Sequence, residues 1–147
     1  MDSVRPFIPR RRPRLAKVIV QVTVTNDRDP TRRKRFSALV DTGASGLVLP
    51  LAWREELGDL EAAATVQLET ADQRVVTADV YGPVWIQIEG FRRIADEVIF
   101  LEMEEGPRGY QPLVGYTVLE KSGAAVDMVS HQLIARKYYD LKSAAVA

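Results

Sequence analysis

The residues best placed to do chemistry are Asp41, Thr42 and Gly43, which directly follow the apolar segment 38–40. A carboxylate at the end of an apolar strand indicates a specific role, because an unpaired buried carboxylate is costly. Glycine at the third position lets another backbone segment come close. Two carboxylates a few ångströms apart share one proton, and such a pair can deprotonate a water and protonate a carbonyl. The pattern therefore indicates acid–base chemistry with Asp41 as one member of a carboxylate pair.

Composition excludes most other catalytic machinery. The 147 residues include no cysteine and one histidine, His131, so thiolate nucleophiles, zinc–thiolate sites and multi-histidine metal sites are excluded. Ser45 is followed too closely by Gly46 to match the G-x-S-x-G pattern of serine hydrolases, and no glycine-rich phosphate loop occurs. We therefore expect no metal and no cofactor, and a surface or hydrogen-bonding role for His131.

Bulk properties describe one globular domain. Apolar residues make up 46% and charged residues 27%, and 20 basic residues balance 20 acidic ones. Net charge thus favours neither nucleic acid nor a membrane surface, and no apolar run reaches the ~18–20 residues of a membrane span. Without a recognisable signal segment, a cytoplasmic location is expected. Residues 1–14 are rich in arginine and are predicted to form an extended basic arm, which we interpret as a solvated tail. The alternatives are that the arm binds a polyanion, or that it is a segment that is cleaved off or exchanged between subunits.

The elements that must position Asp41 are mostly short strands. Hydrophobic periodicity and turn residues predict strands at 18–24, 36–40, 47–49, 65–70, 74–80, 84–88, 97–103, 112–115, 125–129 and 132–135. Short helices are predicted at 51–57 and 116–122, ended by Gly58 and Gly123. The dipeptide Gly82-Pro83 is predicted to break the chain. This pattern is typical of an all-β fold, a closed barrel or a sandwich.

The strand-Asp-Thr-Gly unit occurs only once in the chain. A pair of such carboxylates would therefore come from two chains related by a two-fold axis, which brings Asp41 to face its own copy. The motif thus leads to a prediction about oligomeric state.

Residues 39–45 resemble the active-site motif of retropepsin-like aspartic proteases. The likeness extends to a central hairpin at 68–80, a second apolar-apolar-glycine unit at 113–115 and the helix that follows it, with spacing similar to bacterial single-domain members. It spans roughly 15–140, and implies an all-β retropepsin-like closed barrel, the acid protease fold, with one lobe per chain. Residues 1–14 are then an N-terminal arm and 141–147 a C-terminal tail.

The resemblance also implies a homodimeric aspartic endopeptidase that acts on peptide or protein substrates. The balanced charge and the lack of a membrane span separately predict no nucleic-acid or membrane partner. Asp41 would be the catalytic aspartate, Thr42 would hydrogen-bond across the dimer, and the Gly43 amide would hydrogen-bond the carboxylate. The hairpin would be a flap that closes over an extended peptide. The implied substrate-binding residues are Ala44, the flap tip formed by Ala71, Asp72 and Gln73, and the subsite residues Gln111 and Leu113.

Three positions depart from the family pattern. The flap tip lacks glycine, which predicts a loop longer than a two-residue turn or a less mobile flap. Tyr116 replaces the arginine usual in viral members, which removes an ion pair. Ala44 replaces a hydroxyl residue common in pepsins, so the ionised carboxylate pair has one hydrogen-bond donor fewer. This should leave the pKa of the pair higher, which predicts activity that persists toward mildly acidic or near-neutral pH.

Two other functions remain open from the sequence. A catalytically silent module could keep the fold and use the cleft to bind a peptide or to dimerise. An interaction protein could act through Arg10, Arg11 and Arg12, and its binding to nucleic acid would then depend steeply on salt.

Overall fold

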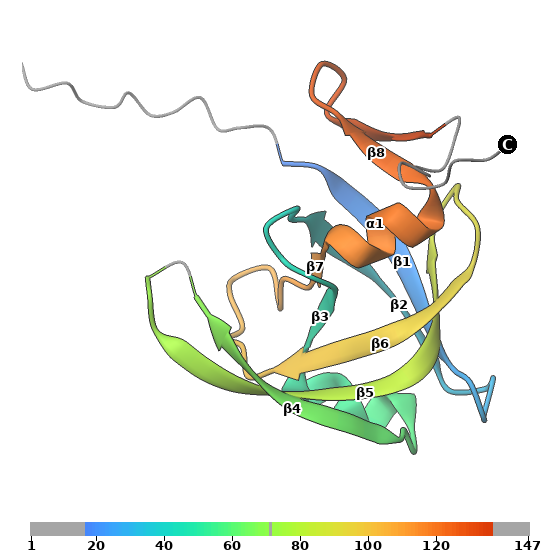
Figure 1. The fold of residues 1–147 in the computed structure, drawn as a ribbon. Helices are drawn as coiled ribbons and strands as arrows, with labels where there is room; N and C mark the ends of the chain where they lie inside the picture. Colours follow the sequence, from blue (N-terminus) through green and yellow to red (C-terminus); the bar gives the residue numbers. More distant parts are fainter. Residues whose placement is uncertain (1–16, 71, 137–147) are drawn as a thin grey trace, which may run out of the picture.

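A computed structural model describes residues 17–70 and 72–136, and these residues form strands with two short helices (Figure 1). The predicted all-β class is confirmed, while the arm 1–14 and the tail 141–147 lie outside the described residues. The elements are β1 (Ile19–Asn26), β2 (Arg33–Val40), β3 (Leu47–Pro50), the 3-10 helix η1 (Leu51–Leu57), β4 (Ala62–Glu69), β5 (Val75–Ile88), β6 (Ile94–Leu101), β7 (Leu113–Val114), α1 (Tyr116–Ser122), β8 (Ala124–Asp127) and β9 (Gln132–Ala135).

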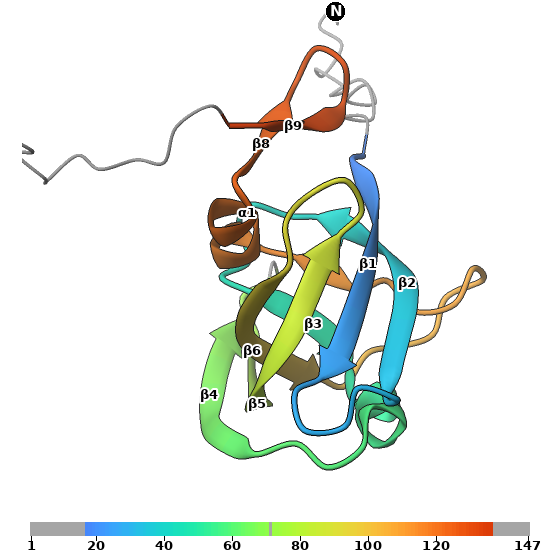
Figure 2. The same ribbon diagram turned by 90° about the vertical axis from the view of Figure 1, so that its right-hand side faces the viewer.

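Six strands close into a ring in the order β1-β2-β7-β3-β6-β5, because β5 pairs with β1 as well as with β6. Most pairs are antiparallel, but β2 runs parallel to β7 and β3 runs parallel to β6. Strand β4 pairs with the first half of β5, and the two form a hairpin that projects from the ring (Figures 1 and 2). The projecting hairpin corresponds to the predicted flap.

The prediction that Gly82-Pro83 breaks the chain is wrong. Strand β5 continues through both residues, and its pairing with β6 shifts register between Tyr81 and Val84. The Gly82-Pro83 bond is cis, and a Cβ on Gly82 would lie 2.9 Å from the Cα of Glu97. A register irregularity accommodates Pro83, because no ladder hydrogen bond requires the N–H that proline lacks. A glycine–proline pair usually ends a strand, but here it only bends β5.

Other boundaries differ by a few residues. Strand β6 is Ile94–Leu101 instead of 97–103, because its pairing with β5 begins at Ile94, immediately after a tight turn. Strand β4 begins at Ala62, earlier than the predicted 65. The helices at Leu51–Leu57 and Tyr116–Ser122 are confirmed, the first as a 3-10 helix, and Gly123 ends α1 in the left-handed conformation.

The core fills the ring and extends under α1. Burial alternates along β1 and β5, as it should for strands with one face toward the core. All four residues of β3 are buried, and α1 adds Val118 and Leu119 to the same cluster. The most deeply buried large side chains include Phe100, Leu47, Leu49, Leu57, Ile86 and Ile88.

The β8–β9 hairpin lies outside the ring, near the start of β1 (Figures 1 and 2). Its turn carries exposed apolar side chains, with Met128 66% and Val129 89% exposed. His131, also in this turn, is exposed and has a positive φ of 58°. None of the helices within 17–70 and 72–136 is both long and apolar enough to cross a membrane.

Candidate active site

Strands β2 and β7 place Asp41 at the edge of the ring. The parallel register pairs Leu39 with Leu113 and Val40 with Val114. The backbone N–H of Asp41 then donates to the carbonyl of Val114 at 2.9 Å, so the ladder extends one residue beyond β2. Asp41 is therefore fixed by a strand from the second half of the chain, and its side chain is half-buried.

The loop 41–46 passes over Gly115 to reach β3 on the far side of β7. Its carbonyls at Ala44 and Ser45 accept hydrogen bonds from the N–H groups of Tyr116 and Thr117, at 2.8 and 3.0 Å. A Cβ on Gly115 would lie 2.4 Å from the Ala44 oxygen and 2.5 Å from the Gly46 oxygen. Only glycine leaves room for this close approach, which explains why a glycine follows the second apolar pair.

The Asp41 carboxylate has one hydrogen bond within the described residues. The Gly43 N–H donates to Oδ1 at 2.9 Å, as predicted from the resemblance. A Cβ on Gly43 would lie 3.2 Å from the same oxygen, so a larger residue would crowd the carboxylate. Thr42 and Gly43 are exposed, and the Thr42 hydroxyl has no hydrogen-bond partner among the residues of this chain that the structure describes. The face that carries the carboxylate is thus open toward solvent.

The flap tip forms without glycine among its described residues, and backbone hydrogen bonds close it. The N–H of Thr70 donates to the carbonyl of Arg74 at 2.8 Å, and the N–H of Gln73 donates to the carbonyl of Thr70 at 2.8 Å. Gln73 has a positive φ of 66°, which fits a three-residue loop with a left-handed third position. The loop is therefore longer than a two-residue turn, as the missing glycine predicted. Ala71 lies outside the described residues.

Asp72 organises this tip. The Thr70 hydroxyl donates to its carboxylate, and the guanidinium of Arg74 lies 3.0 Å from its other oxygen. The Thr70 hydrogen bond is the largest influence and lowers the pKa of Asp72 below its ordinary value of 3.8. The tip is thus held by an ionised carboxylate at neutral pH.

An open groove lies beside the flap and contains two of the predicted subsite residues, Gln111 and Leu113. It is lined by Arg74, Glu102, Met103, Glu104, Gln111 and Leu113. The residues 41–44, Asp72 and Gln73 do not line it. Sequence reasoning missed Glu102, Met103 and Glu104, although their place between a strand and the 113–115 unit was a usable signal.

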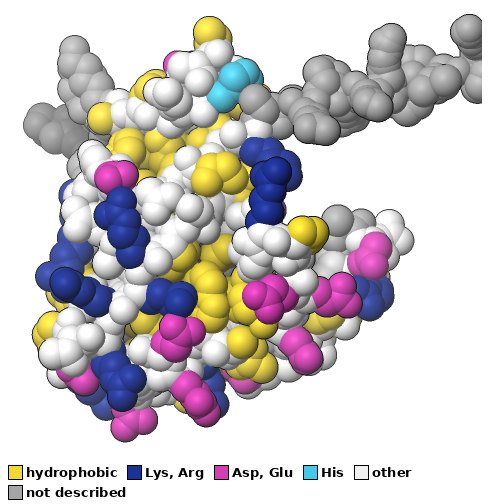
Figure 3. Space-filling model, turned by 180° about the vertical axis from the view of Figure 1, so that it is seen from behind, with side chains coloured by type: hydrophobic (Ala, Val, Ile, Leu, Met, Phe, Trp, Pro, Cys, Tyr) yellow, Lys and Arg dark blue, Asp and Glu magenta, His cyan; other side chains and the backbone are white. Residues whose placement is uncertain are grey.

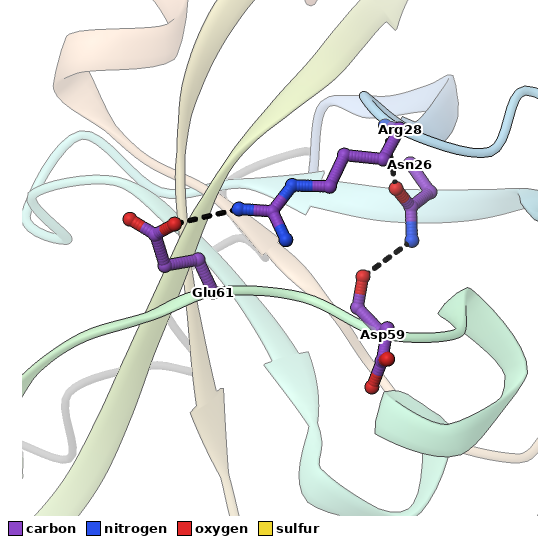
Figure 4. A network of polar contacts seen from close by, with 4 residues as sticks. All are labelled: Asn26, Arg28, Asp59 and Glu61. Atoms are coloured by element: carbon purple, nitrogen blue, oxygen red, sulfur yellow. Dashed lines mark hydrogen bonds and ion pairs between the residues drawn. The ribbon is translucent and has the colours of Figure 1, made fainter.

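A second hollow lies at the other end of β2, far along the strand from Asp41. The buried side chain of Asn26 occupies its wall, with Nδ2 donating to the carbonyls of Leu57 and Asp59 at 2.7 and 2.8 Å. Its Oδ1 accepts the Arg28 N–H at 2.8 Å, and Arg28 forms an ion pair with Glu61 at 2.6 Å (Figure 4). These contacts join the β1–β2 turn to the segment after η1, so we assign the network a structural role.

The described residues thus combine a closed ring of strands, an Asp-Thr-Gly loop at its edge and a projecting hairpin. That combination defines the class of all-β acid proteases. A protein-family model for aspartyl proteases matches residues 20–118, about two thirds of the chain, and the chain belongs to this family. The predicted resemblance to retropepsin-like aspartic proteases and the predicted acid protease fold are both confirmed by this match. A search of curated proteins found no match.

Proposed function

We propose that the chain is a homodimeric aspartic endopeptidase that hydrolyses peptide bonds with a water held between two Asp41 carboxylates, one from each subunit. The observation that carries the proposal is the position of Asp41 at the end of β2. Its carboxylate accepts a hydrogen bond from the Gly43 N–H, and its loop lies within the residues that the aspartyl protease family model matches. In the pair, one carboxylate is ionised and takes a proton from the water, while the other is protonated and donates to the substrate carbonyl.

Surface features support a second copy of the chain. Thr42 is exposed next to Asp41 and is free to donate to the other subunit. The exposed Met128 and Val129 lie on a two-stranded hairpin outside the ring, and a two-stranded sheet alone is marginally stable in water. A second subunit that covers this hairpin would remove the apolar side chains from solvent and stabilise the hairpin.

The flap and the groove support an extended peptide as the substrate. A peptide placed beside Asp41 can pair its backbone with the flap hairpin on one side and the Asp41 loop on the other. Its alternate side chains then point to opposite faces, and those on one face meet the groove that contains Leu113 and Gln111. The half-buried position of Leu113 suits an apolar contact there.

The test compares Asp41→Asn with the wild type in the full chain. We expect Asp41→Asn to fold and to sediment as a dimer but to lose cleavage, because the amide cannot act as the base. Mass spectrometry of the incubated proteins and of a protein substrate would report new termini. Asp59→Asn is the matched control and should cleave normally, because the Asp59 side chain is exposed and it is the backbone carbonyl of this residue that accepts the Asn26 hydrogen bond.

Retained cleavage in Asp41→Asn would refute the mechanism. A wild-type chain that sediments as a monomer at working concentration would refute the carboxylate pair, since one chain supplies only one Asp41. A dimer that binds peptides and never cleaves them would instead identify a catalytically silent binding module.

A further inference from the structure

The groove beside the flap adjoins the Asp41 loop through the β2–β7 pairing. Leu113 lines the groove and pairs with Leu39, two residues before Asp41. The next residue, Val114, accepts the hydrogen bond from Asp41 itself. Figure 3 shows the notch between the projecting hairpin and the body of the molecule, with acidic side chains beside the hairpin. A peptide bound across Asp41 would therefore extend a side chain into this groove.

The groove is negatively charged. Glu102 and Glu104 are exposed, and neither forms an ion pair with another residue in the described part of the chain. Arg74 is the cation that lines the groove, and its guanidinium is paired with Asp72 at 3.0 Å. Arg108 belongs to the same connecting segment but does not line the groove. Two carboxylates thus face the groove without a compensating charge.

The groove also offers apolar surface between its carboxylates. Met103 stands between Glu102 and Glu104 in the sequence, and Leu113 lies on the adjoining strand. Both are half-buried. Lysine and arginine side chains suit such a surface, because their methylene stems pack on apolar atoms while the charged head stays accessible. Arginine adds the planar donor pair that matches a carboxylate.

We propose that Glu102 and Glu104 make this groove a subsite for an arginine or lysine side chain of the peptide substrate. The inference rests on the proposed endopeptidase function and names the substrate class of that site. The contact between either carboxylate and a guanidinium or ammonium group is charge-assisted, and such contacts are stronger than hydrogen bonds between neutral groups.

The test uses pairs of short peptides. The two members of a pair differ at one position, which is arginine in one and glutamine in the other, and the library contains such a pair for each position of the peptide. We expect the full-length wild type to cleave the arginine member about tenfold more efficiently at one position. Glu102→Gln/Glu104→Gln should lose that ratio, and Glu102→Lys/Glu104→Lys should reverse it in favour of the glutamine member. Glu55→Gln/Glu97→Gln removes two exposed carboxylates that do not line the groove and should keep the ratio.

Binding of the same peptides to the Asp41→Asn chain separates this inference from the proposed function. Suppose that neither the wild type nor any variant cleaves, but that Asp41→Asn binds the arginine peptide more tightly than the glutamine peptide. If adding Glu102→Gln/Glu104→Gln to Asp41→Asn abolishes that preference, the subsite proposal stands and the endopeptidase proposal fails. If cleavage occurs and the arginine preference is unchanged in Glu102→Gln/Glu104→Gln, the subsite proposal is overturned. A preference absent from both cleavage and binding overturns it as well.

Discussion

Gly115 is the residue whose substitution should disturb the Asp41 loop most directly. In Gly115→Ala the new Cβ would lie 2.4 Å from the Ala44 oxygen and 2.5 Å from the Gly46 oxygen, which are both backbone atoms. Carbon and oxygen do not approach closer than about 3.0 Å in folded chains, so the loop must move by at least about 0.6 Å. No rotation of a side chain can relieve this contact.

The cost follows from two contributions. Overpacking in a closely packed region costs about 1–3 kcal/mol. The movement also weakens the hydrogen bonds from Tyr116 and Thr117 to the loop, each worth about 0.5–1.5 kcal/mol. We therefore expect Gly115→Ala to lower the free energy of unfolding by about 2–4 kcal/mol. If the proposed function is right, displacement of Asp41 should also reduce the cleavage rate, because small misplacements of catalytic groups can cost about 100-fold.

Urea denaturation of the wild type and the variant, at equal protomer concentration, measures the stability change. Gly46→Ala is the matched control in the same loop, because its Cβ would meet the nearest side-chain atoms at 3.6 and 3.8 Å, which is ordinary contact. The control should change stability by less than about 1 kcal/mol. If Gly115→Ala were as stable as Gly46→Ala, the close approach of the loop to Gly115 would be refuted.

Three further predictions concern the second hollow, the flap and the dimer. Asn26→Ala should lower the free energy of unfolding by about 2–4 kcal/mol, because buried backbone groups lose their partners; a calorimetric scan that shows no loss of stability would contradict it. Thr70→Ala should raise the pKa of Asp72 toward 3.8, and an NMR titration that finds no rise would refute the assigned cause. Because that pKa is lowered in the folded chain, the contribution of Asp72 to stability is complete above pH 3.8 and is lost as the pH falls through the folded-state value, so in Thr70→Ala the contribution should be smaller and its loss should be complete at a higher pH. Thr42→Val should weaken the dimer about tenfold in sedimentation experiments, and an unchanged dimer would exclude a hydrogen bond from Thr42 across the interface.

The local sequence was sufficient to predict where Asp41 lies. An alternating apolar segment followed by Asp-Thr-Gly predicts a strand that delivers a carboxylate to its end, and the Gly43–Asp41 hydrogen bond confirms the short-range part of that prediction. The helix at Tyr116–Ser122 was predicted equally well, because Gly123 supplies a left-handed end. Both features depend on residues close in sequence.

Features that depend on distant segments were missed. The Gly82-Pro83 pair was interpreted as a break, but pairing with β1, β4 and β6 keeps β5 continuous. The buried side chain of Asn26 joins two loops that are distant in the sequence, and no local pattern indicated this role. The groove carboxylates Glu102 and Glu104 were overlooked, because Arg74 and Leu113, which line the groove with them, belong to other segments of the chain. Local patterns cannot show these contacts, because they depend on the closure of the ring.

The insertion of β7 between β2 and β3 has a consequence for how the chain folds. Residues that flank the Asp41 loop find their partner about 70 positions later in the sequence, so forming the loop requires a long-range closure. During synthesis from the N-terminus, Asp41 emerges well before Val114, its hydrogen-bond acceptor, and before Gly115, over which the loop passes. We expect the loop to order only after that later segment has been made. A nascent chain would then carry Asp41 before the structure that the proposed catalysis requires has formed.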